Sequence, residues 1–246
     1  MSSSGLGDKV VERWYSPRTQ RELTLARWGH YGTPLLVFPT AGGDAEEVER
    51  HHLLDHLGEA VDAGRIKVYS VDSTAGRALA THEGSPEHRM WLFNQYHDAI
   101  ASEVVPAIHA DTGAHEIVAA GSSIGAFNAL AMVCRYPQLF RAAICMSGTY
   151  HLEKFIGAFN DDLYFSSPVH FVEGLGGAQL DLLRQRFVVL AAGSGRWEDT
   201  GESWAVAKVL GEKGIPNRVD DWGPSYDHDW PTWWQMLPTY VREIVG

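Results

Sequence analysis

The stretch that decides the fold is HEIVAAGSSIGAFNALAMVC, residues 115–134. It opens with a short apolar run, passes through glycines and serines, and continues with apolar residues at helical spacing. This pattern predicts a strand, a tight turn and a helix. The turn, residues 121–125, reads G-x-S-x-G, and side chains at Gly121 and Gly125 would clash with the neighbouring strand and helix. The pattern is that of a nucleophile elbow, which predicts that Ser123 stands at the tip with its hydroxyl exposed.

The helix predicted to begin after Ser123 would place unpaired backbone N–H groups and a positive dipole end close to the hydroxyl. Such groups stabilise the oxyanion that forms when a serine attacks a carbonyl carbon. We therefore expect the N–H of Ile124 to be one oxyanion donor. The neighbouring hydroxyl of Ser122 is expected to be structural, because Ser122 is not the central residue of the motif.

Strand and helix patterns alternate along the rest of the chain. Strands are predicted at 10–15, 21–28, 34–39, 66–71, 142–146, 187–192 and 218–222, in addition to the elbow strand. Helices are predicted at 46–63, 91–108 (broken by Pro106), 203–213 and 233–245, whereas 151–185 reads as irregular and aromatic-rich. This alternation predicts an α/β fold with a doubly wound, mostly parallel sheet flanked by helices. We expect residues 1–7 to form a flexible tail and 8–246 a single domain.

Composition excludes several classes of partner. The chain has 246 residues and a net charge of -11, so we expect no general attraction to nucleic acid or to anionic membranes. Its two cysteines, Cys134 and Cys145, do not make a disulfide framework, and the first residues lack the pattern of a signal peptide. A cytoplasmic location is therefore expected. No apolar run approaches the roughly 20 residues needed to span a bilayer.

The sequence shows no pattern for a cofactor or a metal ion. It has neither a G-x-G-x-x-G nor a Walker loop, and no C-x-x-C or H-E-x-x-H segment. His51, His52 and His56 fall on one predicted helix, where they are interpreted as surface residues. We therefore expect the protein to work without a cofactor.

A serine nucleophile needs a base within hydrogen-bond reach, and the base needs an orienting carboxylate. With an elbow of this kind the order along the chain is serine, acid, histidine. Three of the 12 histidines follow the elbow: His151, His170 and His228. His228 is the expected base, because it lies between the last predicted strand and the closing helix.

The acid is expected in the loop after the strand at 187–192, since ligands bind at the carboxyl ends of the strands in such sheets. Glu198 and Asp199 both qualify, with Glu202 a weaker third; we favour Glu198 and expect the other to lie at a helix N-terminus. The second oxyanion donor should follow the strand at 34–39, at Ala41 or Gly42. We favour Ala41, although an ordinary glycine turn would have the same sequence.

Three segments together resemble the esterase D and enterochelin-esterase-like branch of the α/β-hydrolases: GSSIGAFNAL (121–130), YPQLFRAAICMSGTY (136–150) and GIPNRVDDWGPSYDHDWPTWWQML (214–237). That branch also contains feruloyl esterases, S-formylglutathione hydrolases and mycolyltransferases. The resemblance covers residues 34–245 and implies an α/β-hydrolase fold without a separate cap domain. It also implies the site residues Ser123, His228, Glu198 or Asp199, Ile124 and a donor near Ala41. One departure is the oxyanion loop, where the family often has His-Gly or Asp-Gly and this chain has Pro39-Thr40-Ala41-Gly42.

These observations predict a serine esterase that acts on a small-molecule ester through an acyl-enzyme. An acyltransferase with the same triad is the alternative, because aromatic residues in 155–171 and four tryptophans in 222–234 could enclose an acceptor alcohol. The tryptophans could equally pack the closing helix. A non-catalytic binding protein on the same scaffold is a third hypothesis. The sequence leaves the acyl and alcohol groups open, and also the oligomeric state, a homo-oligomer included.

Overall fold

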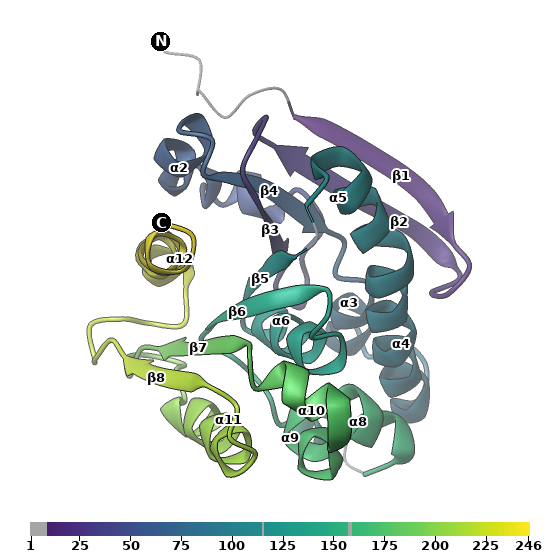
Figure 1. The fold of residues 1–246 in the computed structure, drawn as a ribbon. Coiled ribbons are helices and arrows are strands. Elements are labelled where there is room, and N and C mark those ends of the chain that lie inside the picture. Colours follow the sequence, from purple (N-terminus) through teal and green to yellow (C-terminus); the bar gives the residue numbers. More distant parts are fainter. Residues whose placement is uncertain (1–8, 115, 157–158) are drawn as a thin grey trace.

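The computed structural model describes residues 9–114, 116–156 and 159–246. The predicted tail at residues 1–7 and His115, the first residue of the quoted stretch, lie outside the described residues. At the centre is an eight-stranded sheet in the order β1-β2-β4-β3-β5-β6-β7-β8 (Figure 1). Its strands are β1 Val10–Ser16, β2 Arg21–Trp28, β3 Thr33–Phe38, β4 Ile66–Val71, β5 Ile117–Ser122, β6 Phe140–Met146, β7 Phe187–Ala192 and β8 Asn217–Asp221. Only β1 with β2 and β2 with β4 pair antiparallel, which confirms the mostly parallel sheet.

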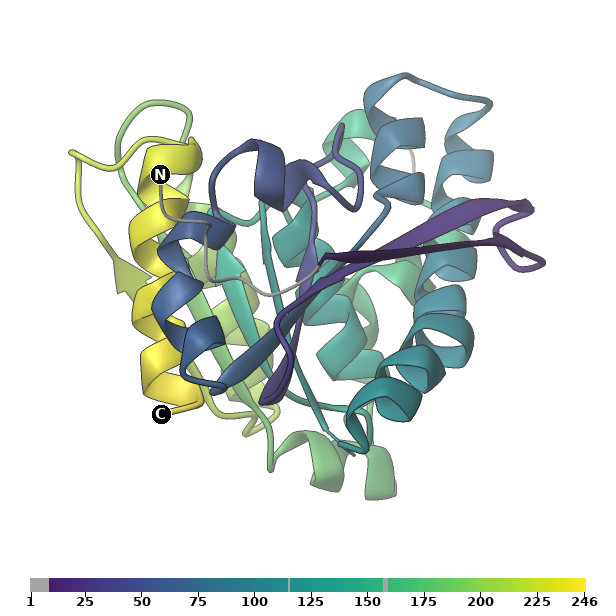
Figure 2. The ribbon, with the colours of Figure 1, turned by 90° about the horizontal axis from the view of Figure 1, so that it is seen from above.

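Helices cover both faces of this sheet (Figures 1 and 2). One face packs against α3 Thr74–Ala80, α4 Pro86–Ala99, α5 Val105–Thr112, α6 Ile124–Arg135, α7 Glu153–Ile156, α8 Asp161–Ser166, α9 Pro168–Phe171, α10 Gly177–Leu183 and α11 Thr200–Glu212. The other packs against α1 Glu47–Arg50, α2 Gly58–Asp62 and α12 Trp230–Ile244. In β3, Leu36 and Phe38 belong to the hydrophobic core on the side of α3 to α11. Leu35 and Val37 belong to the core on the side of α1, α2 and α12. This explains the continuous apolar run, since a strand buried on both faces cannot alternate with polar residues.

Residues 46–63 do not form the single helix that the spacing predicts. α1, a 3-10 helix at Leu54–His56, and α2 follow one another there. The break comes at His52, whose φ of 60° is incompatible with a right-handed helix. The apolar residues assigned to one face are nevertheless all buried: Val48, Leu53, Leu54, Leu57 and Val61. Burial against the sheet therefore accounts for the pattern, and it does not require an unbroken helix.

Two other predictions were wrong. Pro106 does not end its helix, because α4 continues through a π-helical turn at Ile100–Val104 into α5, where Pro106 lies in the first turn. The chain stays helical through Pro106, and the change to π-helical hydrogen bonding comes immediately before the proline. Residues 151–185 are not simply irregular either, since they contain α7 to α10 and a 3-10 helix at Val172–Gly174. These helices are short, so they lack the long apolar period that identifies a helix in a sequence.

The winding of the chain changes direction at β3. From β3 the chain passes to β4 on one side, and from β4 it returns across β3 to β5 on the other side. The loops that leave the carboxyl ends of β3 and β5 therefore meet above this topological switch point, where open α/β sheets bind ligands. The predicted oxyanion loop and the predicted elbow are these two loops.

Candidate active site

Ser123 occupies the turn between β5 and α6 with φ 58° and ψ -122°. A residue with a side chain adopts such a backbone at a cost of order 1–3 kcal/mol, and such residues cluster at functional sites. Both flanking glycines are required for the turn. A Cβ on Gly121 would lie 2.3 Å from the carbonyl carbon of Gly125, and a Cβ on Gly125 would lie 2.3 Å from the carbonyl oxygen of Phe38. The predicted clash at both positions is confirmed.

Backbone hydrogen bonds hold the elbow against the end of the neighbouring strand. The N–H of Ser123 donates to the carbonyl of Met146 over 3.0 Å, and the N–H of Thr149 donates to the carbonyl of Ser123 over 3.3 Å. The Ser123 side chain is only partly buried, and its hydroxyl donates to no acceptor in the described part of the chain. Since α6 begins at Ile124, the N–H of that residue is one of the helix's unpaired donors.

The loop after β7 places Glu198 against His228. The Glu198 side chain is 1% exposed, and its Oε2 lies 3.5 Å from Nδ1 of His228. That separation is an electrostatic contact, slightly longer than a normal hydrogen bond. The other oxygen, Oε1, accepts a hydrogen bond from the hydroxyl of Ser147, and that hydroxyl accepts one from Nε1 of Trp233 over 3.0 Å. Ser147 and Trp233 thus hold the carboxylate in place, and residue-by-residue reasoning on the sequence missed both of them.

The other two acid candidates have different partners. Asp199 caps α11, because its Oδ1 accepts from the N–H of Gly201 over 2.9 Å. Glu202 accepts from the backbone N–H of Tyr150 over 2.7 Å and from Nζ of Lys154 over 2.7 Å. Burial acts to raise the pKa of Glu202, but the Lys154 ammonium and the backbone donors outweigh it and hold that pKa below its usual value. Glu202 therefore anchors the loop after β6 as a carboxylate.

His228 reaches this position because the loop after β8 folds over the loop after β7. The N–H of His228 donates to the carbonyl of Arg196 over 3.0 Å, and Oδ1 of Asp227 accepts from the N–H of Arg196 over 2.7 Å. The close approach depends on glycine, since a Cβ on Gly193 would lie 1.9 Å from the carbonyl oxygen of Tyr226. The His228 ring packs edge-on against Trp233 with centroids 5.4 Å apart.

No hydrogen bond joins His228 to the Ser123 hydroxyl among the residues that the structure describes. Catalytic hydrogen bonds often tighten only when the substrate is bound. The two residues lie at the same edge of the sheet, because Ser123 follows β5 and His228 follows β8, and the carboxyl ends of parallel strands share one edge. Backbone hydrogen bonds from Ser147 to Ala191 and from Trp222 to Ala192 tie the ends of β6, β7 and β8 together.

The predicted oxyanion loop is a β-turn over residues 40–43, closed by the N–H of Gly43 donating to the carbonyl of Thr40 over 3.1 Å. The N–H and hydroxyl of Thr40 both donate to the carboxylate of Glu47. Thr40 and Gly43 have therefore used their N–H groups. Within the described ranges, the N–H groups of Ala41 and Gly42 donate to no acceptor, so these two remain available to a ligand.

The remaining residues singled out in the sequence have structural partners. Nδ1 of His151 lies 3.0 Å from Oε2 of Glu202, and His170 packs edge-on against Phe159. Two histidines of the broken helix region stack on α12: His51 on Trp230, with centroids 4.4 Å apart, and His56 on Trp234, with centroids 5.2 Å apart. Nε1 of Trp234 also donates to the carbonyl of His51 over 2.7 Å. These two tryptophans therefore fasten the closing helix to the segment between α1 and α2.

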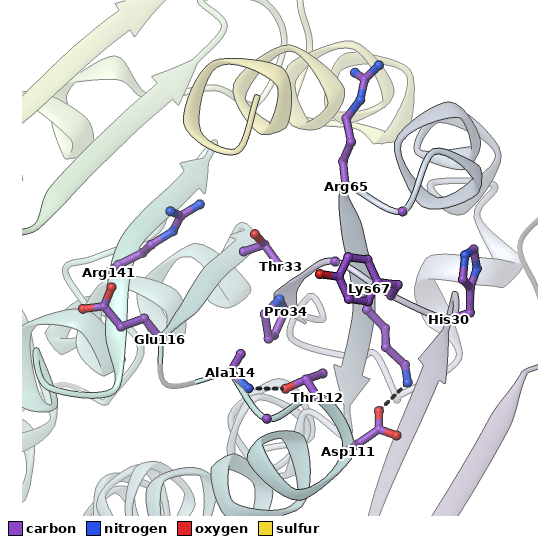
Figure 3. Close-up of a pocket in the computed structure, with 14 residues that line it drawn as sticks. His30, Thr33, Pro34, Arg65, Lys67, Asp111, Thr112, Ala114, Glu116 and Arg141 are labelled. Carbon is purple, nitrogen blue, oxygen red and sulfur yellow. Dashed lines mark hydrogen bonds and ion pairs between the residues drawn. The ribbon is translucent and has the colours of Figure 1, made fainter.

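A cavity of about 680 Å³ lies at the opposite edge, where β3, β4 and β5 begin (Figure 3). Its charged side chains have ionic or backbone partners, some of them outside the cavity. Nζ of Lys67 lies 2.6 Å from Asp111, and Glu116 pairs with Arg186 over 2.7 Å. Arg141 donates to the carbonyl of Ile244 over 3.3 Å. This cavity lies away from the elbow and holds none of the predicted site residues.

Two further observations bear on cofactors and membranes. Within residues 9–114, 116–156 and 159–246, no three His, Cys, Asp or Glu side chains are grouped so that they could hold a metal ion. In the same part of the chain, every helix is too short or too polar to cross a bilayer.

Comparison with known proteins identifies the family. Residues 66–244 match the family model described as "Putative esterase". The chain belongs to this esterase family. It is accordingly a serine ester hydrolase, and the resemblance drawn from the three sequence segments is confirmed. A search of curated proteins gave no match.

Several solved structures have the same fold as this esterase. A ferulic acid esterase superposes with a TM-score of 0.76 at 16% identity, over 98% of each chain. An S-formylglutathione hydrolase from Agrobacterium tumefaciens gives 0.72 at 14% identity, over 100% of this chain and 98% of that one. FphF, a fluorophosphonate-binding serine hydrolase of Staphylococcus aureus, gives 0.67 at 16% identity, over 98% and 99%. The fold is that of the α/β-hydrolases, and the described residues form no separate cap domain.

Proposed function

We propose that this esterase hydrolyses small-molecule carboxylic esters through a triad of Ser123, His228 and Glu198 and an acyl-enzyme intermediate. The observation that carries the proposal is the buried Glu198 carboxylate, 3.5 Å from Nδ1 of His228, at the edge of the sheet that also bears Ser123 on its strained turn. A carboxylate at Nδ1 selects the tautomer that leaves Nε2 free to accept a proton. Asp199, the other acid considered, is occupied as a helix cap.

In the proposed mechanism, His228 takes the proton of the Ser123 hydroxyl as its oxygen attacks the ester carbonyl carbon. Glu198 stabilises the imidazolium that results, while the N–H groups of Ile124 and Ala41 bind the oxyanion. His228 then protonates the leaving alcohol, and the acyl group stays on Ser123. In the second half, His228 takes a proton from a water molecule as the water oxygen attacks the acyl carbonyl carbon. The bond from the acyl carbon to the Ser123 oxygen then breaks, His228 returns the proton to that oxygen, and the acid and the free serine result.

Labelling with a fluorophosphonate tests this assignment, because the reagent phosphonylates only an activated serine. Intact-mass measurement and peptide mapping should find one adduct, on Ser123, and His228→Ala should lose it. His30→Ala is the matched control, since His30 is exposed at the opposite edge of the sheet and should label like the unmodified protein. Labelling on another residue, or undiminished labelling of His228→Ala, would contradict the triad.

We also propose a cytoplasmic location and no nucleic-acid partner. The structure leaves Cys134 and Cys145 as free thiols in the core, and burial raises the pKa of the Cys145 thiol to about 12. Cysteines that stay unpaired are typical of a reducing compartment. The net charge of -11 opposes binding to nucleic acid.

A further inference from the structure

Glu47 is a buried carboxylate that the triad does not use. It lies in the first turn of α1, and the residue is 6% exposed. Its Oε2 accepts from the backbone N–H of Thr40 over 2.8 Å, and its Oε1 accepts from the Thr40 hydroxyl over 2.6 Å. Both oxygens of the carboxylate are thus directed at one residue, the first of the β-turn that forms the predicted oxyanion loop.

This contact determines which N–H groups of the loop are available. The backbone N–H of Thr40 is taken by Glu47, and that of Gly43 closes the turn. The N–H groups of Ala41 and Gly42, at the two central positions of the turn, find no acceptor among the described residues. The loop also lies beside the elbow, since Gly125 packs directly against the carbonyls of Phe38 and Pro39.

The loop has little freedom to adopt another conformation. A Cβ on Gly43 would lie 2.5 Å from the carboxyl carbon of Glu47, so the turn packs directly on that side chain. On its other side, a Cβ on Gly76 of α3 would lie 3.0 Å from the carbonyl oxygen of Ala41. The turn is therefore enclosed between Glu47 and α3, and Glu47 supplies its only side-chain hydrogen bonds in the described structure.

We infer that Glu47 is a positioning residue for catalysis: it holds Thr40 so that the Ala41 N–H points toward the oxyanion formed on the Ser123 adduct. The inference rests on the proposed function, in which the Ala41 N–H is the second oxyanion donor, and it identifies Glu47 as the residue that holds this donor in place. The role requires a hydrogen-bond acceptor at position 47 and does not require its negative charge.

The test compares Glu47→Ala, Glu47→Gln and the control Glu46→Ala. Glutamine keeps an acceptor for the Thr40 N–H, whereas alanine removes both bonds. Glu46 is the adjacent acid, more exposed and paired with Lys9 at the surface. Each variant is assayed for kcat and KM on p-nitrophenyl acetate, and for the inhibition constant of a trifluoromethyl ketone, which forms a tetrahedral oxyanion on the serine.

Glu47→Ala should lower kcat about 100-fold, the usual effect of losing one oxyanion donor, with KM within about threefold. The inhibition constant of the ketone should rise by a similar factor, because the oxyanion of its adduct depends on the same N–H donor. KM should change little, because binding of the uncharged substrate does not depend on that donor. The kcat of Glu47→Gln should stay within about fivefold of that of the unmodified enzyme, and the kcat of Glu46→Ala should equal that of the unmodified enzyme. A purely structural role would not separate kcat from KM or transmit the loss to the ketone.

The inference is overturned if Glu47→Ala keeps its kcat and its affinity for the ketone, or if Glu47→Gln falls as far as Glu47→Ala. Should Glu47→Ala fail to fold, Thr40→Val removes only the hydroxyl bond and should lower kcat about tenfold; unchanged kinetics in that variant overturn it equally. Failure of the proposed function looks different, since the unmodified enzyme would then carry no fluorophosphonate adduct on Ser123.

Discussion

From the surroundings of His97 we predict how the stability of this protein depends on pH. The residue is fully buried in α4, where Nε2 lies 3.0 Å from Oδ1 of Asn128 and Nδ1 lies 3.4 Å from the Arg135 guanidinium. Burial, together with the positive charge of Arg135, lowers the pKa of His97 from 6.5 to about 3. The folded protein therefore keeps this imidazole neutral at pH values where the unfolded chain protonates it.

The sign of the effect follows from proton binding. Between pH 6.5 and about pH 3 the unfolded chain carries one more proton at this site than the folded protein, so the free energy of unfolding falls as the pH falls. The slope rises to about 1.4 kcal/mol per pH unit once the unfolded histidine is protonated, which makes a loss of roughly 2 kcal/mol between pH 6.5 and about pH 4.5. Well above pH 6.5 the site contributes no pH dependence, because the imidazole is then neutral in both states.

The assay is urea unfolding at several pH values, followed by the fluorescence of the nine tryptophans. His97→Gln should show a shallower dependence, with about 1.4 kcal/mol per pH unit removed from the slope, because glutamine does not titrate. Phe127→Leu, a core variant beside the same ring, should be less stable at every pH with the slope unchanged. If His97→Gln and the unmodified protein have the same slope between pH 6.5 and about pH 4.5, the reasoning about His97 is refuted.

Five substitutions test the site geometry and the elbow. Glu198→Gln should lower kcat/KM about 10⁴-fold, because the orienting carboxylate is lost. Asp199→Ala should keep turnover within about threefold and lower the free energy of unfolding by about 1 kcal/mol, because a helix cap is lost. The opposite ranking of the two variants in the same ester assay would exchange their roles. Gly125→Ala should abolish turnover and cost about 1–3 kcal/mol in the unfolding assay, while Gly211→Ala, an open position in α11, should be tolerated. Ser147→Ala should lower kcat about tenfold by removing a hydrogen bond to a charged group, and an unchanged kcat would show that the Ser147 hydroxyl is not needed to hold the carboxylate.

Much of the architecture could be read from short-range patterns. The elbow was evident because its G-x-S-x-G turn stands between a strand pattern and a helix pattern in one continuous stretch, and Gly121 is required by a contact within that stretch, with Gly125. The contact that requires Gly125 itself comes from Phe38 of the neighbouring strand β3. The strands of the parallel sheet were evident because burial on both faces makes them continuously apolar. The prediction of one helix over residues 46–63 was wrong, because the positive φ at His52 leaves no mark on the apolar spacing.

What the sequence by itself determined, then, is the α/β order of elements and the loops in which site residues lie, since both follow from local patterns of burial and turn geometry. Only the tertiary structure decided which acid faces His228. Glu198 and Asp199 are adjacent in the chain, and the fold directs one inward to Ser147 and His228 and the other to the start of α11. Only the tertiary structure decided that Glu47 pairs with Thr40 as well. In both cases the residues form no recognisable sequence motif, and their contact depends on how separate loops pack at one edge of the sheet.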